Sequence, residues 1–428
     1  MKIIIAILVF SVIVIFHELG HFLLAKKNGI AVTEFSLGMG PRLWSVQRGE
    51  TRYSLKLFPI GGSCMMVGED DDDASEGSFN KASVWARISV VAAGPVFNFI
   101  LAFLFAMIIT SVVGYDPAEI LWVEENSPAA EAGLQEGDII TEFQGKHISI
   151  GRDYELYTTL HGVKDEDITL IYERDGEKHE ISFEANSTEK YMLGYSYAPG
   201  DNGEAEIVSV SIDGAVMDAG VLAGDVIRGI NGTQINTSDE LQTYMEEHPL
   251  DGSQVTLDIE RNGKVQTIAV TPQMTKQVDT GFICNVYREK TDFIGILKYS
   301  AVEVRYWISS TIESLVMLIK GQFTVQDLSG PVGIIDVIGD SYEEAKTEGT
   351  LMVVMQMLYW AILLSANLGV MNLLPIPALD GGRLVFLVIE AITRRRVNPN
   401  VEGMIHFAGF VLLMMLMVFV MFNDVMRL

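Results

Sequence analysis

The chain has 428 residues, of which 49% are hydrophobic, and its formal net charge at pH 7 is −26. All of the acidic excess lies in residues 114–350, whereas both ends of the chain are close to neutral and very apolar. A strongly acidic centre argues against nucleic acid as a partner and predicts a solvated region flanked by membrane segments.

Four apolar runs are long enough to cross a bilayer, which requires about 20 mainly apolar residues. These runs are Ile3–Ala25, Ile88–Val113, Met352–Leu374 and Ile405–Phe422. The first run follows Lys2, as in a signal peptide, but it is long and lacks a small-residue cleavage site. We therefore predict four membrane-spanning helices.

Positive charges predict how these helices are oriented. Lys26 and Lys27 close the first run, and residues 394–396, all arginine, precede the fourth. Cytosolic loops are enriched in Lys and Arg, so both clusters are expected in the cytosol. The N-terminus, the acidic centre and the C-terminus then lie outside. Cys64 and Cys284 would fall on opposite sides of the membrane, so no disulfide is expected between them.

The first run carries the sequence HELGH, with His17, Glu18 and His21. Two residues four apart project from one face of a helix, so both imidazoles can bind one Zn²⁺ at about 2.0–2.1 Å. Glu18 lies beside them and is suited to activate a water molecule. His17 precedes Lys26 by nine residues, roughly 13 Å along a helix, and ionisable groups at such depth are costly and usually functional. The alternative is a polar patch that packs against another helix.

The stretch 35–66, between the first two runs, alternates in hydrophobicity. Tyr53, Leu55 and Leu57 alternate with polar residues, which is typical of a half-buried strand. The glycines and prolines that punctuate this stretch fit two such strands in a hairpin, and an ordinary cytosolic hairpin is one interpretation of it. The acidic run Glu69–Asp73 lacks the ligand spacing of a calcium loop and is predicted to be a solvated loop.

The acidic centre contains an internal repeat. EAGLQEGDIITEFQGKHI (131–148) aligns at an offset of 87 residues with DAGVLAGDVIRGINGTQI (218–235). In each copy the pattern predicts a short helix, a Gly-Asp turn and a strand. A second helix and a further strand are predicted later in the copies, at Tyr154–His161 and Ile168–Arg174, and at Ser238–His248 and Gln254–Arg261. The sequence thus predicts one small β-rich module, present twice.

The repeated pattern resembles PDZ domains in the circularly permuted arrangement found in bacterial proteases. By that resemblance, the ligand-binding loops would open at Gly114-Tyr115 and Gly194-Tyr195. PDZ modules bind peptides by adding a strand to a sheet edge. The alternative is that both copies are rigid spacers. After the second copy, Phe293–Gly321 has apolar residues at helical spacing and predicts an amphipathic helix near the outer membrane surface.

Two histidines leave a zinc ion short of a third protein ligand, with a fourth position kept for water. The candidate is Asp380, which follows the third run in a segment broken by Pro375, Pro377 and Gly381. Broken backbone at membrane depth is tolerated where it lines a cavity. A helix cap or a solvated turn are the alternatives for this aspartate. His406 begins the fourth run and is predicted to be interfacial or packed rather than a ligand.

Several motifs together resemble the site-2 protease family of intramembrane zinc metalloproteases. They are HELGH, NLLPIPALDGG and GPVFNF (Gly94–Phe99), with further similarity in FSLGMGPRLW, LFPIGG and LSGPVGI (Leu328–Ile334). Tandem PDZ-like modules between the second and third spans resemble the bacterial regulator-of-sigma-E protease branch of that family.

The resemblance implies roles for individual residues. It implies that His17, His21 and Asp380 are the zinc ligands and that Glu18 is the general base. It also implies that Asn372 hydrogen-bonds the substrate backbone. Further implications are that GPVFNF packs the second span against the first and that the hairpin dips into the membrane beside the zinc. The amphipathic segment and the PDZ pair would then gate substrate access.

The predicted fold is an α-helical polytopic membrane protein with four transmembrane helices, a membrane-associated β-hairpin and two inserted extracytoplasmic, β-rich PDZ-like domains. The predicted domains are the N-terminal membrane part (1–113), PDZ-like domain 1 (114–192), PDZ-like domain 2 (193–285), an amphipathic linker or gate (286–350) and the C-terminal membrane part (351–428).

The predicted function is cleavage of transmembrane segments of single-pass membrane proteins by a zinc metalloendopeptidase. Its predicted location is a bacterial plasma membrane, with the active site toward the cytosol. An anti-sigma factor, a leftover signal peptide or a pheromone precursor all fit as substrates, and the PDZ-like modules would take peptide C-termini or extended segments. Alternatives are a non-proteolytic scaffold that binds peptides and a metal transporter. HELGH with Asp380 argues against the first, and the lack of further buried ligands argues against the second.

Overall fold

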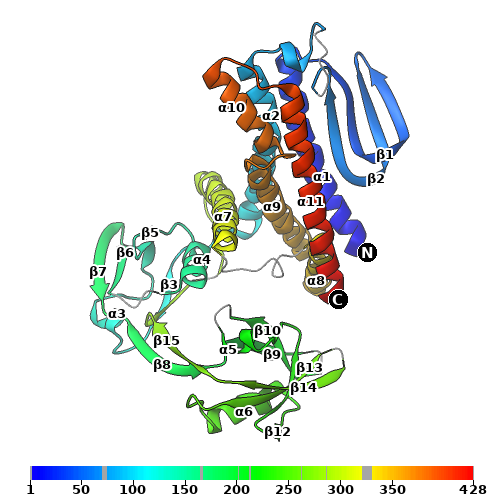
Figure 1. Ribbon diagram of the computed structural model, residues 1–428. Helices are drawn as coiled ribbons and strands as arrows, with labels where there is room; N and C mark the ends of the chain where they lie inside the picture. Colours follow the sequence, from blue (N-terminus) through cyan, green and yellow to red (C-terminus); the bar gives the residue numbers. More distant parts are fainter. Residues whose placement is uncertain are drawn as a thin grey trace. The chain divides into compact units, whose positions relative to one another are not determined.

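The computed structural model describes residues 2–69, 75–163, 167–200, 202–211, 214–261, 263–285, 287–320 and 330–427. Most of the acidic run at 69–73 and the first two residues of LSGPVGI lie outside these ranges. The chain forms two compact units, which are Met1–Asp116 with Tyr287–Leu428, and Pro117–Val286 (Figure 1). The second unit is therefore an insertion in the first.

The first unit is mainly helical. Its helices are α1 (Lys2–Lys27), α2 (Val84–Val113), α7 (Phe293–Ile319), α8 (Pro331–Glu348), α9 (Thr350–Leu373), α10 (Asp380–Thr393) and α11 (Pro399–Arg427), with a 3₁₀ turn η1 (Phe79–Lys81). Among the described residues, α1, α2, α9 and α11 are long and apolar enough to cross a membrane, as the sequence predicts. The predicted amphipathic segment is helical as α7.

Small residues let the apolar helices approach closely. A Cβ on Gly20 of α1 would lie 2.4 Å from the carbonyl oxygen of Ala93 on α2, and a Cβ on Gly369 of α9 would lie 2.6 Å from the Phe99 ring. Close backbone approach at small residues is the usual basis of helix packing in membranes. The segment GPVFNF therefore packs against α9 as well as α1.

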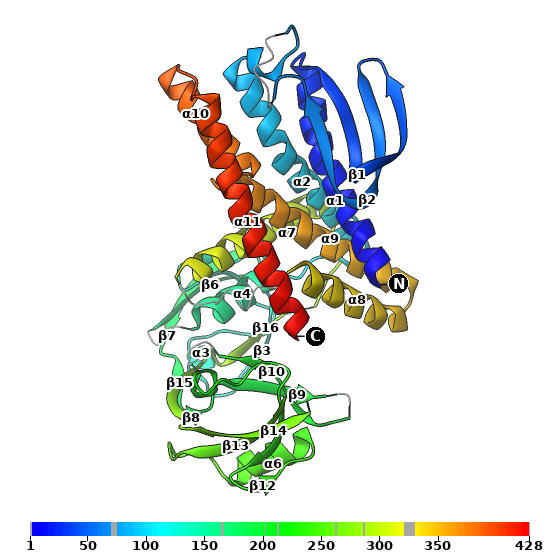
Figure 2. The same ribbon diagram turned by 45° about the vertical axis from the view of Figure 1, so that its right-hand side comes forward.

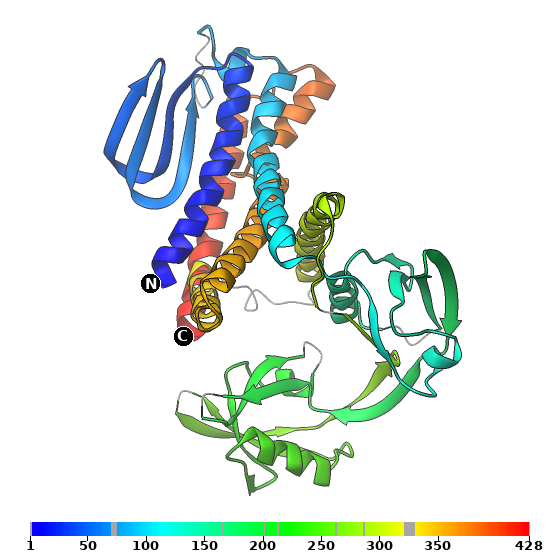
Figure 3. The same cartoon turned by 180° about the vertical axis from the view of Figure 1, so that it is seen from behind.

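A curled two-stranded sheet lies beside α1 (Figure 3). Its strands are β1 (Val32–Arg48) and β2 (Thr51–Met66), and residues 34–37 of β1 pair both with 52–55 and with 62–65 of β2. The predicted hairpin is therefore present. Both of its strands bend back on themselves, so that four strand segments lie side by side in the sheet. The Arg42 guanidinium lowers the pKa of the buried Glu34 carboxyl to about 2, so this pair stays ionised and ties the two arms of β1 together.

The second unit contains two lobes built on the same plan (Figure 2). The elements of lobe 1 are α3 (Pro128–Glu131), β4 (Ile139–Phe143), β5 (Lys146–His147), α4 (Gly151–His161), β6 (Ile168–Arg174) and β7 (Glu177–Phe183). Their counterparts in lobe 2 are α5 (Ala215–Asp218), β11 (Val226–Ile230), β12 (Thr233–Gln234), α6 (Ser238–Glu247), β13 (Val255–Arg261) and β14 (Lys264–Val270). Each counterpart begins 87 residues later, so the predicted repeat is a structural one.

The Gly-Asp turn of each lobe is held by an arginine from a distant strand. Asp138 accepts hydrogen bonds from Arg174 at 2.6 and 2.7 Å, and Asp225 accepts from Arg261 at the same two distances. Both aspartates are only 1% exposed. The sequence pattern predicts the Gly-Asp turns but not the ion pairs that hold them.

The first strand pair has the same register in both lobes. In lobe 1, however, one of the two strands comes from a distant part of the chain. In lobe 2, β9 (Tyr195–Pro199) pairs with β10 (Ala205–Val210), and Tyr195 is opposite Val210. In lobe 1, β3 (Ile120–Val123) pairs with β16 (Phe282–Cys284), and Phe282 is opposite Val123. Lobe 1 is thus completed by a strand that follows lobe 2 in sequence. The predicted second domain, 193–285, takes in this strand of lobe 1.

The predicted loop at Gly114-Tyr115 is therefore wrong, because Gly281-Phe282 occupies the position in lobe 1 that Gly194-Tyr195 occupies in lobe 2. The residue 87 positions before Tyr195 lies inside α2, so the chain cannot supply a strand there. Tyr115 instead forms a bridge with Glu289 and stacks on Tyr299, with ring centroids 3.6 Å apart. A further strand pair, β8 (Asn186–Met192) with β15 (Gln273–Asp279), leads into and out of lobe 2.

Replacing Asp225 with Asn should destabilise lobe 2 by about 2 kcal/mol, because hydrogen bonds to charged partners contribute about 1.5–3 kcal/mol. Hydrogen exchange of the full chain should speed up in β11 and β13, while the matching strands of lobe 1 stay unchanged as an internal reference. The exposed Glu247→Gln substitution serves as the charge-removing control. Equal protection of lobe 2 in Asp225→Asn and wild type would show that the ion pair contributes nothing.

Candidate metal centre

The histidine pair lies in the second half of α1. His17 and His21 are 9% and 8% exposed, and their Nε2 atoms are 3.2 Å apart. The i, i+4 spacing in an uninterrupted helix produces this approach. Two imidazole nitrogens that converge in a buried setting need a shared partner, either a proton or a metal ion.

Asp380 reaches the same point from the far end of the chain. It is the first residue of α10, after the irregular segment that follows α9. Its Oδ2 atom lies 3.2 Å from Nε2 of His17 and 3.5 Å from Nε2 of His21. Among the described residues, these three form a group able to hold a metal ion, with all ligand atoms within 4.8 Å of one another.

The three ligand atoms fit a tetrahedral zinc ion. Zinc bonds of about 2.0–2.1 Å with tetrahedral angles require ligand atoms about 3.3–3.4 Å apart, and the three separations here are 3.2, 3.2 and 3.5 Å. Gly94 of α2 forms one wall, because a Cβ there would lie 2.4 Å from Nε2 of His21 and 2.7 Å from Cε1 of His17. The site therefore combines a suitable donor set with space that only a glycine leaves.

Comparison with known proteins decides the family. The model of peptidase family M50 matches residues 5–416. The chain belongs to peptidase family M50. It is 32% identical to the zinc metalloprotease RasP of Geobacillus kaustophilus, over 98% of this chain and 97% of that protein. It is also 32% identical to the protein of the same name from Shouchella clausii, over 99% and 98% of the two chains.

A third relative, the regulator of sigma-W protease RasP of Bacillus subtilis, is 30% identical over 99% of this chain and 97% of that protein. These findings confirm the predicted family, the enzyme class of zinc metalloprotease and the zinc cofactor. With the four apolar helices, they make the chain an integral membrane protein.

In this M50 peptidase, each histidine is held through its other ring nitrogen. Nδ1 of His21 donates to the carbonyl oxygen of Val90 at 2.9 Å, which leaves Nε2 free to bind a metal. Nδ1 of His17 lies 3.2 Å from the side-chain amide of Asn98. Neither contact is predicted by the sequence pattern. Only the position of Asn98 within GPVFNF, on an apolar helix, could have signalled a polar role.

Glu18 faces the β-sheet. Residue 62 of β2 lies against its side chain, since a Cβ on Gly62 would lie 2.9 Å from Cγ of Glu18. The edge of β2 thus lies directly against the carboxylate beside the metal ligands. Asn372 is in the last turn of α9 and is partly buried. Its substrate contact stays a prediction.

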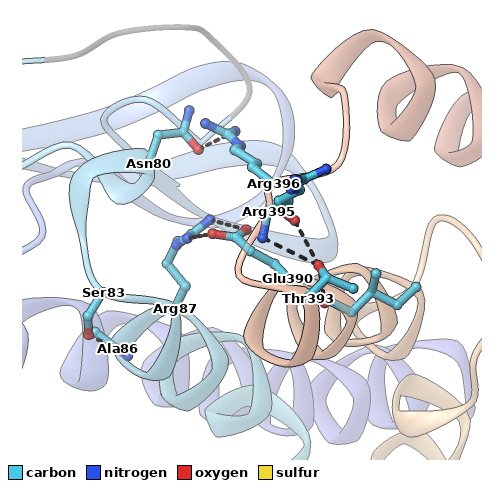
Figure 4. Close-up of polar contacts among 9 residues, drawn as sticks. Asn80, Ser83, Ala86, Arg87, Glu390, Thr393, Arg395 and Arg396 are labelled. Atoms are coloured by element: carbon cyan, nitrogen blue, oxygen red, sulfur yellow. Dashed lines mark hydrogen bonds and ion pairs between the residues drawn. The ribbon is translucent and has the colours of Figure 1, made fainter.

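Helix α10, which carries Asp380, is anchored to α2 by a buried ion pair. Arg87 of α2 donates through both terminal nitrogens to the two carboxylate oxygens of Glu390, one of them at 3.1 Å (Figure 4). The arginine side chain is 6% exposed. Just beyond the end of α10, Arg396 donates to the amide oxygen of Asn80 at 2.7 Å.

The other end of α10 is held by α11. Nδ1 of His406 accepts a hydrogen bond from the N–H of Ala378 at 2.9 Å. Ala378 has φ +78°, a conformation that costs a non-glycine residue of order 1–3 kcal/mol, so the turn before Asp380 requires outside support. His406 also lies 5.6 Å from the Phe386 ring. It is packed, as predicted, but it also holds this turn.

Replacing Gly94 with Ala should weaken zinc binding about 10- to 100-fold, because overpacking typically costs about 1–3 kcal/mol. Zinc retained per chain after competition with a chelator measures the effect. Gly403→Ala, at a helical glycine with nothing within 4 Å of the added Cβ, is the matched control and should keep its zinc. Full retention in both variants would mean that Gly94 does not bound the metal site.

Proposed function

We propose that this protein is an intramembrane zinc metalloprotease that cleaves transmembrane segments of single-pass membrane proteins. The observation that carries the proposal is the triangle of His17, His21 and Asp380 ligand atoms, built on a helix long and apolar enough to span a bilayer. Three protein ligands leave one tetrahedral position for water, as catalytic zinc sites require. A soluble or purely structural zinc site has no need of ligands at this depth.

The proposed chemistry assigns each residue a task. Zinc, when bound, supplies Lewis acidity and lowers the pKa of water toward 7. His17, His21 and Asp380 hold it. Glu18 takes the proton of the attacking water and later passes it to the leaving amine. Asn372 holds the backbone of the extended substrate by a hydrogen bond.

The proposed topology places the metal site toward the cytosolic side of a bacterial plasma membrane. Support comes from the positive charges, because Lys26 and Lys27 end α1 while arginines 394–396 link α10 to α11 at the same end of the helical unit (Figure 1). The two β-rich lobes would then be extracytoplasmic.

We propose that β2 receives the substrate. A transmembrane helix shields its own peptide bonds, so cleavage requires a locally unwound segment whose lost hydrogen bonds are replaced. Strand addition at a sheet edge replaces them, and β2 is the strand whose Gly62 lies against Glu18. Large exposed apolar side chains on the sheet, including Trp44, Leu57 and Phe58, suit contact with lipid.

The two lobes are proposed to be PDZ-like modules, with β3 to β7 and β16 forming lobe 1 and β9 to β14 forming lobe 2. In lobe 2, β9 is an edge strand beside a groove of about 320 Å³. Tyr197, Met245 and Leu250 are among the residues that line it, which suits an apolar peptide C-terminus or extended segment. The lobes and α7 together would act as a filter that excludes substrates with intact outer domains.

The substrate class is proposed from the relatives. One of them is named a regulator of sigma-W protease, so an anti-sigma factor, or alternatively a signal-peptide remnant, is the proposed substrate here.

Changing Glu18 to Gln should abolish cleavage of a model transmembrane peptide, by at least about 10²-fold, while zinc binding is kept. Asp380→Asn, by contrast, should lower both zinc content and cleavage, because it removes a ligand charge. Both variants are assayed as purified full-length protein, with zinc measured alongside peptide cleavage. Near wild-type turnover in Glu18→Gln would exclude this residue as the general base.

Removing the second unit should allow cleavage of substrates that retain their outer domain. Tyr115 and Glu289 exchange backbone hydrogen bonds of 2.9 and 2.7 Å, so a short linker can join Asp116 to Tyr287 without disturbing the helical unit. A smaller deletion of 193–272 removes lobe 2 alone, because Met192 and Gln273 are paired neighbours.

Cleavage of long and pre-trimmed substrates is compared in cells for both deletions, with Glu18→Gln added to each as the inactive control. The filter is expected to be lost in the larger deletion, and the smaller one assigns it to one lobe or both. Unchanged discrimination in the larger deletion would remove the filter from the proposal.

A further inference from the structure

Asn98 is the one side chain that holds a metal-binding histidine in place from outside the ligand set, among the residues described. It lies on α2, one helical turn beyond Gly94, and is fully buried at 0% exposure. Its side-chain nitrogen is 3.2 Å from Nδ1 of His17. Its own backbone oxygen accepts a hydrogen bond from Ser365 of α9 at 2.8 Å, which fixes α2 at this point.

The tautomer of His17 decides whether the Asn98 side chain must donate or accept a hydrogen bond. A neutral imidazole that gives the lone pair of Nε2 to a metal carries its hydrogen on Nδ1. The partner of Nδ1 must then be an acceptor, and the amide nitrogen is a donor. The Oδ1 atom of Asn98 is buried and accepts no hydrogen bond. Turning the amide by 180° exchanges its two ends, so that Oδ1 accepts from Nδ1–H of His17.

We propose that Asn98 is a positioning residue for the zinc site, with its Oδ1 accepting from Nδ1–H of His17. This one contact selects the tautomer of His17 and fixes the plane of its ring. His21 needs no such residue, because the main-chain carbonyl of Val90 does the same for it. The two histidines are therefore held differently, and only the support of His17 can be removed by a side-chain substitution.

The expected size of the effect follows from other metal sites. Partners that hold ligating histidines by hydrogen bonds typically change metal affinity by about 10- to 100-fold when they are removed. A buried Nδ1–H without an acceptor is costly in addition. The effect should appear in zinc affinity itself and not only in turnover.

The test compares two substitutions of similar size. Asn98→Asp keeps an acceptor oxygen at the same place, whereas Asn98→Leu keeps the volume and removes the acceptor. The zinc dissociation constant of purified full-length protein is measured by chelator competition. We expect Asn98→Asp to stay within about threefold of wild type and Asn98→Leu to bind about 10- to 100-fold more weakly.

The matched control is Asn367→Leu, the same substitution at a neighbouring polar position in α9, whose amide bonds Thr311 and not the metal site. It should leave zinc affinity unchanged. If Asn98→Leu does not accumulate, Asn98→Ala removes the acceptor without adding bulk and repeats the comparison. Absorption of Co²⁺-substituted protein gives a second readout, because a tilted His17 changes the tetrahedral spectrum.

Two results would overturn the inference. One is wild-type zinc affinity in Asn98→Leu, and the other is equal loss in Asn98→Leu and Asn98→Asp, which would indicate packing alone. The inference rests on the proposed zinc site, and the experiment separates the two. A wild-type protein that binds no zinc contradicts the proposed function, whereas zinc-bound wild type with an unaffected Asn98→Leu contradicts only the role of Asn98.

Discussion

The close approach of α2 to α1 is the contact on which the metal site depends. Gly20 lets the backbone of α2 come against α1, and Gly94 places that backbone directly beside the two imidazoles. From this position α2 offers the Val90 carbonyl to His21 and the Asn98 amide to His17. A larger residue at either glycine would force the helices apart and separate the histidines from both supports. The charged and polar groups of the site are thus held by an interface whose specificity comes from small residues.

Asp380 depends on a different set of contacts. It must be brought to the histidines from a helix that is too short to cross the membrane, after a broken segment of backbone. The ion pair of Arg87 with Glu390 fixes one end of α10 to α2, and His406 supports the turn at the other end. Because Arg87 and Asn98 lie on the same helix, α2 is the common frame for all three candidate ligands. Removing one partner of a buried ion pair leaves the other charge uncompensated, so Arg87 and Glu390 are expected to be required together.

Much of this arrangement could be predicted from sequence, for local reasons. The spacing within HELGH places both histidines on one helical face whatever surrounds them, and apolar length alone identifies the spanning helices. The repeat at an offset of 87 residues is visible because the elements α3 to β7 of lobe 1, like α5 to β14 of lobe 2, follow one another directly along the chain. Asp380 could be named as a candidate from the Pro- and Gly-broken segment around it, but a helix cap or a solvated turn remained open until the family resemblance was considered.

Other features depend on contacts between distant segments and left no local signal. The Val90 carbonyl that holds His21 is a main-chain group, so its side chain carries no information about it. The ion pair of Arg174 with Asp138 joins two charged residues that are 36 positions apart, and nothing beside either residue indicates the other as its partner. The loop assigned to Gly114-Tyr115 failed because sequence order suggested that each lobe supplies its own first strand.

The late position of β16 in the chain has a consequence for the order in which the two lobes fold during synthesis. Phe282 belongs to the hydrophobic core of lobe 1, yet it follows the whole of lobe 2 along the chain. During synthesis, lobe 2 can close on itself as soon as β14 is complete, while lobe 1 must wait, unfinished, with its core open to solvent. Contacts over such sequence separations form slowly, because a long loop must close first. The second lobe to appear on the chain is therefore the first to mature, and a prematurely ended chain would carry one finished lobe and one that proteases can recognise as incomplete.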